Sequence, residues 1–516
     1  MFTIRNVIFY FFLLSIIAES VSGQVSSDSL VRFSDLKFHS EFEKEALSNF
    51  VKNRVDTFNF FLAIDEDMSG CEAEKIKGSY QGIFDDLEGK KIVNKKINRK
   101  IKLAYASVHS RFMKRYNENE YFPVIFQKGT YNCVSASMLF TMIFDRLDIP
   151  YKVMASSDHV YLVANPGSNS VVIETTNPGF EKAIFTGEFK QQYVSYLRNS
   201  KLISENELRN KSVEEIFEEN FKEVREAEFI NLPGIQYYNK ALIKLQDNNV
   251  EDALELSQKA YFFFPENQVK TLLYTALLYH LEKCSFEKVS DIDYLAQLAR
   301  FENTQVDAVV AIFSNIIVHH LQYTDREAFC DSLYHRLISQ ITDKKAIEEI
   351  GFNYNMQMSY RYQFSDKVEK YVKRALDIKG NYHDANIILG NYLNRKLNTL
   401  TDPYVLLDTL DRYDEIYNYE MITPMLTERR SMAYLDIARE MFRQKKMTSG
   451  DEYLKKFEAV CLAPVTNQLL VDMIERIYRV VALYYFSGGN KSKAQSYVNR
   501  GLKFVPGSDL LKYTVY

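Results

Sequence analysis

The chain has no tryptophan and few cysteines among its 516 residues. The absence of tryptophan excludes an indole ring from any catalytic role, and leaves aromatic packing to 36 tyrosines and 36 phenylalanines. The five cysteines are far apart, odd in number and without a CxxC pair, a pattern typical of neither a disulfide framework nor a zinc site. They are Cys71, Cys133, Cys284, Cys330 and Cys461.

The chain also has only a small excess of negative over positive charge, and few long apolar runs. A net charge of −4 gives no electrostatic reason to expect a nucleic-acid partner. The apolar run over residues 7–18 is shorter than the roughly 20 residues that cross a bilayer. With Arg5 before it and small residues at 21–23 after it, this run predicts a signal peptide over 1–23, the alternative being an uncleaved anchor. We therefore expect an exported protein of the periplasm, cell envelope or extracellular medium, with no membrane span after cleavage.

Hydrophobic spacing divides the rest of the chain into four parts. Residues 24–120 show apolar positions three and four apart and form an N-terminal helical region. Residues 121–190 mix one helix with short β-rich runs, and residues 191–231 form a highly charged helical connector. Residues 232–516 are helical and repetitive.

Small residues recur in the last part at fixed offsets. The set Ala241, Ala253, Ala260 and Pro265 has offsets of 12, 7 and 5, and so has the set Ala482, Ala494, Gly501 and Pro506. Small residues at such offsets let two antiparallel helices approach closely. The spacing resembles the tetratricopeptide repeat of about 34 residues, which implies an all-α solenoid that binds a polypeptide substrate or a protein partner.

The mixed part contains a cysteine at the start of a helix. In KGTYNCVSASMLF the polar loop ends at Asn132, and an apolar helix is expected over residues 133–147. A helix N-terminus offers unpaired N–H groups and the positive end of the dipole, which favour a thiolate. Cys133 is therefore the candidate nucleophile.

A base and an orienting acid follow on a predicted hairpin. The runs HVYLVA and VVIETT, separated by turn residues, read as two antiparallel strands. With residues 164–169 as the loop, His159 lies directly opposite Glu174. Opposed side chains are about 4.5–5.5 Å apart at Cβ, which allows an imidazole–carboxylate hydrogen bond. The pattern predicts a Cys133–His159–Glu174 triad, with no cofactor and no metal-ligand cluster.

This order of Cys, His and acid resembles the transglutaminase-like superfamily. The matching motifs are YNCVSAS, DHVYLVA and VVIETTNPG, within about residues 121–185. The resemblance implies an α+β papain/transglutaminase-like core, with a helix packed on an antiparallel sheet, followed by the tetratricopeptide-like solenoid. One departure is that Glu174 stands where the superfamily usually has Asp. Gln127 is a candidate donor for an oxyanion hole. It precedes Cys133 by six residues, which is the spacing of the oxyanion glutamine in papain-like peptidases.

Two functions are consistent with these residues. The first is an exported thiol enzyme that acts on amide bonds, as a cysteine peptidase or amidase or as a transglutaminase-like acyltransferase. The second is a non-catalytic envelope scaffold that uses the same fold and the repeats for protein–protein interaction. The two differ in whether the thiol, imidazole and carboxylate come together in an accessible site.

Overall fold

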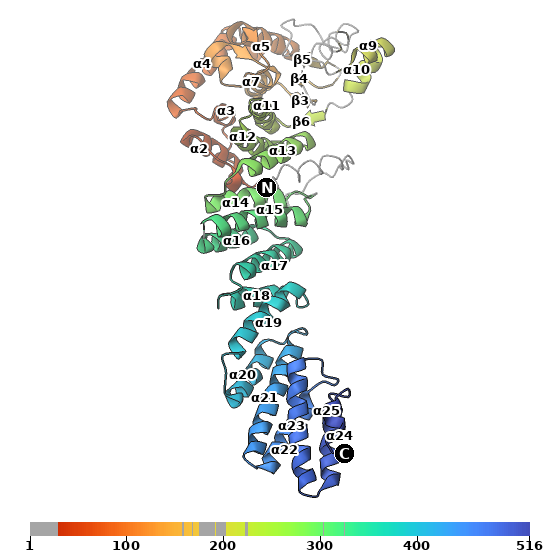
Figure 1. Ribbon diagram of the computed structural model, residues 1–516. Helices are drawn as coiled ribbons and strands as arrows, with labels where there is room; N and C mark the ends of the chain where they lie inside the picture. Colours follow the sequence, from red (N-terminus) through yellow and green to blue (C-terminus); the bar gives the residue numbers. More distant parts are fainter. Residues whose placement is uncertain are drawn as a thin grey trace. The chain divides into compact units, whose positions relative to one another are not determined.

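The computed structural model describes most of the chain (Figure 1). The described residues are 29–156, 159–167, 169–174, 191, 194, 203–221, 225–302, 304–324 and 326–515. The predicted signal peptide at 1–23 lies outside them. The chain divides into two compact units, Met1–Ser285 and Phe286–Tyr516.

The first unit begins with helices, as the apolar spacing predicts. These are α2 (Glu41–Val51), α3 (Thr57–Leu62), α4 (Gly70–Gly89) and α5 (Ile97–Phe112). Ser40, Asp56 and Ser69 cap the first three, each through a side-chain oxygen that accepts a backbone N–H of the first turn. Polar caps ahead of each apolar run explain where these helices start.

A short parallel pair precedes the central helix. Strand β1 (Arg115–Tyr116) pairs with β2 (Thr130–Tyr131), and α6 (Val124–Lys128) lies between them in sequence. Gly129 joins α6 to β2 with a φ of 74°, where a Cβ would stand 2.8 Å from the Lys114 side chain. Only glycine fits there without strain. The next helix, α7 (Cys133–Arg146), is buried on all sides from Cys133 to Phe144.

Four strands form the second sheet, in the order β5–β4–β3–β6. They are β3 (Tyr151–Ala155), β4 (Val160–Ala164), β5 (Val171–Ile173) and β6 (Arg225–Ala227), all antiparallel to their neighbours. The predicted β4–β5 hairpin is confirmed. Helix α7 contacts β3 and β4, and the Ser137 hydroxyl lies 3.5 Å from the Val160 carbonyl.

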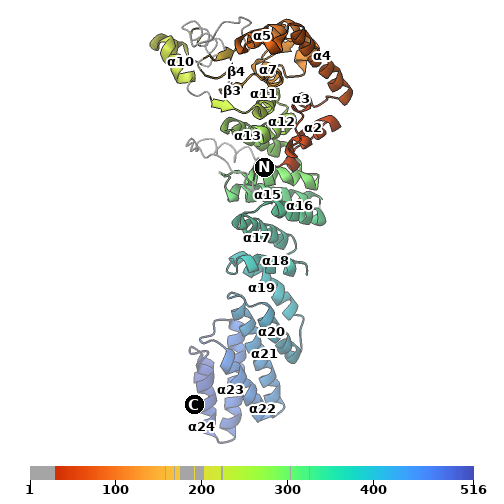
Figure 2. The ribbon, with the colours of Figure 1, turned by 180° about the vertical axis from the view of Figure 1, so that it is seen from behind.

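The described residues of the charged connector include two α-helices and one strand. These are α9 (Glu205–Asn210) and α10 (Val213–Phe221), followed by β6, which pairs with β3. Helices α11 (Leu232–Gln246), α12 (Val250–Phe263) and α13 (Asn267–Lys283) complete the unit. Both views place α11 beside α7 (Figure 2). Leu232, Tyr237 and Phe263 belong to the same hydrophobic core as α7, so these helices join the first unit and not a separate repeat domain.

The predicted α+β papain/transglutaminase-like core is wrong. Helices account for 70% of the chain and strands for only 4%, in two small sheets. The physical reason is that α7 does not rest on a large sheet: α3 and α11 also contact it, and Tyr105 of α5 stacks on its Phe140 at 5.7 Å. A helix that is apolar all round needs such cover.

The described residues of the second unit form helices without strands. They are α14 (Ile292–Ala299), α15 (Val306–His319), α16 (Glu327–Gln340), α17 (Lys344–Arg361), α18 (Val368–Ile378), α19 (His383–Leu397), α20 (Pro403–Ile416), α21 (Thr423–Arg443), α22 (Met447–Val460), α23 (Gln468–Ser487), α24 (Lys491–Leu502) and α25 (Asp509–Lys512).

The recurrent small residues lie where these helices meet. Ala241, Ala253 and Ala260 are fully buried in the first unit, and Ala482 and Ala494 in the second. Hydroxyl–carboxylate bonds also join helices, as in Tyr392 and Tyr417, which both donate to Glu369. Among the described helices, none is both long and apolar enough to cross a membrane.

Candidate functional site

Cys133 is the first residue of α7, as predicted. Asn132 caps the helix: its Oδ1 accepts the Ser135 N–H at 2.8 Å, and the Ser135 hydroxyl accepts the Asn132 N–H at 2.9 Å. This reciprocal pair is a capping box, which fixes the first turn of the helix. The thiol is therefore held at the positive end of a 14-residue helix.

Asn132 also ties the helix start to a distant loop. Its Nδ2 donates to the carbonyls of Glu118 and Glu120 at 3.0 and 2.7 Å. Gln236 of α11 donates to the same Glu120 carbonyl at 3.1 Å. Three segments far apart in sequence thus fix the backbone just before the thiol. No local pattern in the sequence predicts these contacts.

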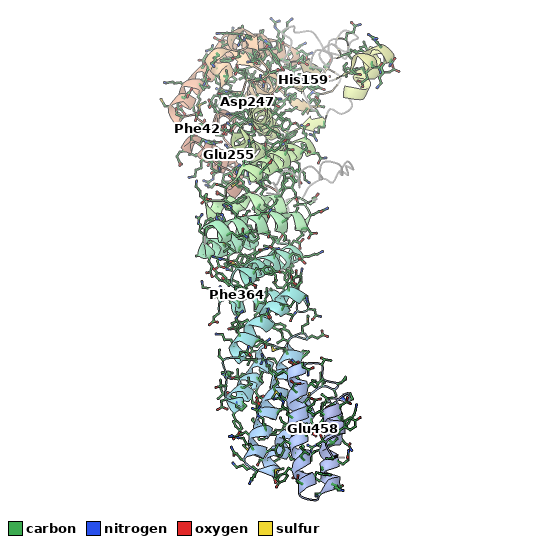
Figure 3. All side chains as sticks on the ribbon, in the orientation of Figure 1. Phe42, His159, Asp247, Glu255, Phe364 and Glu458 are labelled. Carbon is green, nitrogen blue, oxygen red and sulfur yellow. The ribbon has the colours of Figure 1, made fainter. Side chains whose placement is uncertain are left out.

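His159 and Glu174 lie together beside α7. Nε2 of His159 is 3.1 Å from both carboxylate oxygens of Glu174. His159 precedes β4 by one residue and Glu174 follows β5 by one residue, so the sheet brings both side chains to one end of the hairpin. Figure 3 shows His159 beside these strands.

The predicted register of the hairpin is wrong by two residues. Leu162 pairs with Ile173 and Ala164 with Val171, so the loop begins at Asn165 and not at Ala164. Extending this register sets Tyr161, and not His159, opposite Glu174. The carboxylate therefore reaches the imidazole diagonally, a geometry open to long side chains.

Cys133 contributes to the electrostatics of His159. Burial alone would lower the pKa of His159, but the negative charge of Glu174 and side-chain hydrogen bonds with Cys133 and Glu174 raise the pKa well above 6.5. The three predicted residues are thus brought together in the order Cys133–His159–Glu174.

The three side chains differ in their contact with solvent. The exposed fraction is 7% for Cys133 and 4% for His159, whereas the Glu174 side chain is 24% exposed. The dry surroundings strengthen charge interactions within the group. They also mean that the thiol is covered in this state of the protein.

Two tyrosines that were not among the predicted site residues lie beside His159 and Glu174. The ring of Tyr161 lies nearly parallel to the His159 ring, with 6.0 Å between centroids and 21° between planes. Burial raises the pKa of Tyr105 on α5, and the charge of Glu174 raises it further. Tyr105 therefore stays neutral at physiological pH. Tyr161 shares the sheet face of His159, which the two-residue period of the strand does indicate.

Gln127 has a different environment. Its Nε2 donates to Glu72 of α4 at 3.0 Å, on an exposed surface. That contact gives no support to an oxyanion role, so the chemistry proposed below does not use Gln127. Within the described residues, no three His, Cys, Asp or Glu side chains are grouped as metal ligands. The five cysteines, all among the described residues, form no disulfide.

The sequence was compared with family models and with curated proteins. No family model matches the chain, and no curated protein resembles it in sequence. The interpretation of the site therefore rests on its own geometry.

Proposed function

We propose that the protein is a thiol enzyme that acts on amide bonds, with Cys133 as nucleophile, His159 as acid and base, and Glu174 as the residue that orients His159. The observation that carries the proposal is the His159–Glu174 pair at 3.1 Å, together with the contribution of Cys133 to the raised pKa of His159. The transglutaminase-like resemblance supports the same chemistry through the order of these residues, although the papain-like fold is absent.

The chemistry follows from the raised pKa of His159. The raised pKa makes the neutral imidazole of His159 a stronger base, so the ring takes the thiol proton and leaves a thiolate–imidazolium pair. The thiolate attacks the amide carbonyl, the C–N bond breaks, and the imidazolium gives its proton to the departing amine. Water or a second amine then attacks the thioester, His159 takes the proton of the attacking group, and the Cys133 sulfur leaves.

Glu174 holds the imidazole in place through both steps. A carboxylate on Nε2 fixes the tautomer and the orientation of the imidazole ring. It also stabilises the imidazolium that must persist between attack and departure. Removal of its charge should therefore weaken the proton relay without removing the thiol.

A second function, an envelope scaffold without turnover, is favoured by one observation. Cys133 is only 7% exposed, so a substrate carbonyl has little access to the sulfur in this state. A scaffold would keep the Cys133–His159–Glu174 group as a structural core. The helical second unit would then carry the main function by binding a protein partner.

The deciding experiment is alkylation by iodoacetamide, followed by mass spectrometry at Cys133 from pH 5 to 9. An ordinary thiol, with a pKa of about 8.5, is scarcely ionised at pH 6. The enzyme proposal predicts that Cys133 reacts at pH 6 in the wild type, and that His159→Ala slows this reaction at least tenfold. Cys71 is exposed and serves as an internal reference in the same sample.

The scaffold proposal predicts a different profile. Cys133 would then react more slowly than Cys71 at every pH, because it is buried, and His159→Ala would not slow it. Such a result would sink the enzyme proposal. Reaction of Cys133 ahead of Cys71 at pH 6, lost in His159→Ala, would sink the scaffold proposal.

A further inference from the structure

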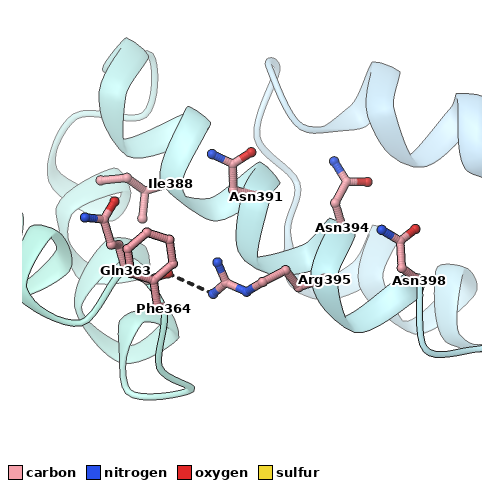
Figure 4. Close-up of a pocket in the computed structure, with 7 residues that line it drawn as sticks. All are labelled: Gln363, Phe364, Ile388, Asn391, Asn394, Arg395 and Asn398. Carbon is pink, nitrogen blue, oxygen red and sulfur yellow. Dashed lines mark hydrogen bonds between the residues drawn. The ribbon is translucent and has the colours of Figure 1, made fainter.

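The second unit contains a pocket lined mainly by amide side chains (Figure 4). It has a volume of about 330 Å³ and lies between α19 and the segment that follows α17. This volume is at the lower end of the range for small-molecule sites, about 300–1,000 Å³. The amides in its lining are Gln363, Asn391, Asn394 and Asn398.

Three of these amides share one face of α19. Asn391, Asn394 and Asn398 are three and four residues apart, so the helix period sets them in a row. Figure 4 shows Arg395 lying between this row and Phe364. The lining residues include no acidic side chain.

The cations around the pocket are already engaged. Arg395 donates from Nη2 to the Gln363 carbonyl at 2.8 Å. Arg429 of α21 donates to Oδ1 of Asn394 at 3.1 Å and to Oδ1 of Asn398 at 2.8 Å. Because a guanidinium only donates, it fixes the orientation of both amides and leaves each NH₂ group directed away from it. The pocket thus offers fixed amide groups beside two guanidinium groups that donate to neutral oxygens.

The ring of Phe364 lies at the edge of the pocket and is almost fully exposed to solvent. Phe364 is 85% exposed, more than any other large apolar side chain identified as exposed in the described residues. The Arg395 guanidinium lies 5.9 Å from the centre of its ring, which holds one side of the ring against the pocket. The other face is an apolar platform. An exposed phenylalanine is costly to keep in water unless something covers it.

We propose that this pocket binds a sugar ring of an oligosaccharide. Each hydroxyl of a pyranose both donates and accepts, so it can bond to either end of an amide. Asn394 and Asn398 present their NH₂ groups, because their oxygens accept from Arg429. Asn391 adds a further amide on the same helix. The C–H face of the ring fits the negative face of an aromatic ring, which Phe364 presents. The lining has no acidic side chain, and the two arginines donate to neutral oxygens, so the pocket suits a neutral or an acidic sugar and not a cationic one.

The test uses the full-length chain and isothermal titration with neutral trisaccharides (maltotriose, cellotriose, chitotriose) and with trigalacturonic acid. We expect at least one of these sugars to bind, with a tenfold or greater loss of affinity in Phe364→Ala and in Asn391→Ala. Both residues are exposed, so neither change removes core packing. Tyr484→Ala is the matched control, because Tyr484 is also an exposed ring (53%) in the same unit and does not line the pocket.

The outcomes distinguish a neutral glycan from an acidic one, and a glycan from a peptide. Binding of a neutral sugar alone identifies a neutral glycan, and binding of the uronic acid alone identifies an acidic one. The proposal is overturned if no trisaccharide binds, or if both pocket variants bind as the wild type does. It is also overturned if a tripeptide such as Gly-Phe-Gly binds with the same dependence on Phe364 while the sugars do not.

Discussion

Glu174 reaches His159 across a diagonal of the β4–β5 pair, with both carboxylate oxygens 3.1 Å from Nε2. A directly opposed carboxylate would be closer at Cα and would suit a shorter side chain. The extra methylene of Glu is therefore matched to the diagonal register. The departure from Asp, which looked like a weakness in the sequence, fits the geometry of this hairpin.

The reach of Glu174 can be tested by shortening it. Glu174→Asp withdraws the carboxylate by roughly 1.5 Å, one C–C bond, and should break its hydrogen bonds with His159. We expect alkylation of Cys133 at pH 6 to fall at least fivefold although the charge is kept. An unchanged rate would show that charge alone matters and that the diagonal contact is dispensable.

Removal of the charge should move the titration of His159. Glu174→Gln keeps the length of the side chain and removes the charge that opposes burial, so the pKa of His159 should fall. In the wild type the raised pKa stabilises the fold fully below the unfolded pKa of about 6.5, and this contribution is lost as pH rises through the folded value. NMR of histidine-labelled protein measures the shift directly. The remaining histidine signals are the control, and a His159 signal that titrates equally in both proteins would contradict the assignment.

A buried ion pair joins α2 to α12. Nζ of Lys259 is 2.5 Å from Glu43 and 2.9 Å from Glu66, and both Lys259 and Glu43 are fully buried. Lys259→Met leaves the Glu43 charge without its main partner and should cost about 3–5 kcal/mol in the free energy of unfolding. Urea unfolding followed by circular dichroism measures this loss.

Two control variants accompany this prediction. One breaks an exposed ion pair in α2, and the other removes both charges of the buried pair. Lys44→Met breaks an exposed pair with Glu41 and should cost less than about 1 kcal/mol. Adding Glu43→Gln to Lys259→Met should restore most of the stability, because it removes the unpaired charge. A Lys259→Met variant as stable as Lys44→Met would contradict the prediction.

Asp451 should control acid stability in the second unit. Its burial would raise the pKa, but hydrogen bonds from Arg500, Tyr497 and Lys455 lower the pKa to about 2. A lowered pKa stabilises the fold above the unfolded value of about 3.9 and ceases to do so as pH falls through 2. Asp451→Asn should therefore cost on the order of 2 kcal/mol at pH 7, with a difference from wild type that shrinks between pH 4 and pH 2. Denaturant unfolding at several pH values checks this, and a difference independent of pH would refute it.

Two glycines should respond to alanine with opposite signs. At Gly501 of α24 an added Cβ would lie 2.8 Å from Leu511 and 3.0 Å from Tyr478, so Gly501→Ala should destabilise by about 1–3 kcal/mol through overpacking. At Gly78 of α4 nothing lies within 4 Å, so Gly78→Ala should stabilise by about 0.5–1 kcal/mol. Thermal unfolding of both variants is the measurement. Equal effects would mean that close helix approach does not explain Gly501.

The sequence predicts the parts of this protein that local patterns encode. Asn132 ahead of an apolar helix predicts where α7 begins, and the turn residues between two apolar runs predict the β4–β5 hairpin. The register fails because Ala164 is apolar and fully buried and so extends the strand, which moves the start of the loop to Asn165. Whether Ala164 is buried depends on how α7 and its neighbours pack on the strand, which the local sequence does not encode.

Long-range contacts account for the other errors. The α+β core was expected because short β-rich runs follow the helix, but their extent is limited and other helices cover α7. Strand β6 reads as helix, since Arg225, Glu226 and Ala227 all favour helices, and only pairing with β3 makes it a strand. Tertiary pairing overrides local preference there.

The late arrival of β6 also matters during synthesis and in any shortened form of the protein. Strand β3 at Tyr151–Ala155 has β4 on one side and gains its other neighbour only from Arg225–Ala227. A fragment that stops at residue 190 would leave one edge of β3 with unpaired N–H and C=O groups. Such an edge can pair with a strand of another molecule, so the fragment should aggregate more than the longer chain does.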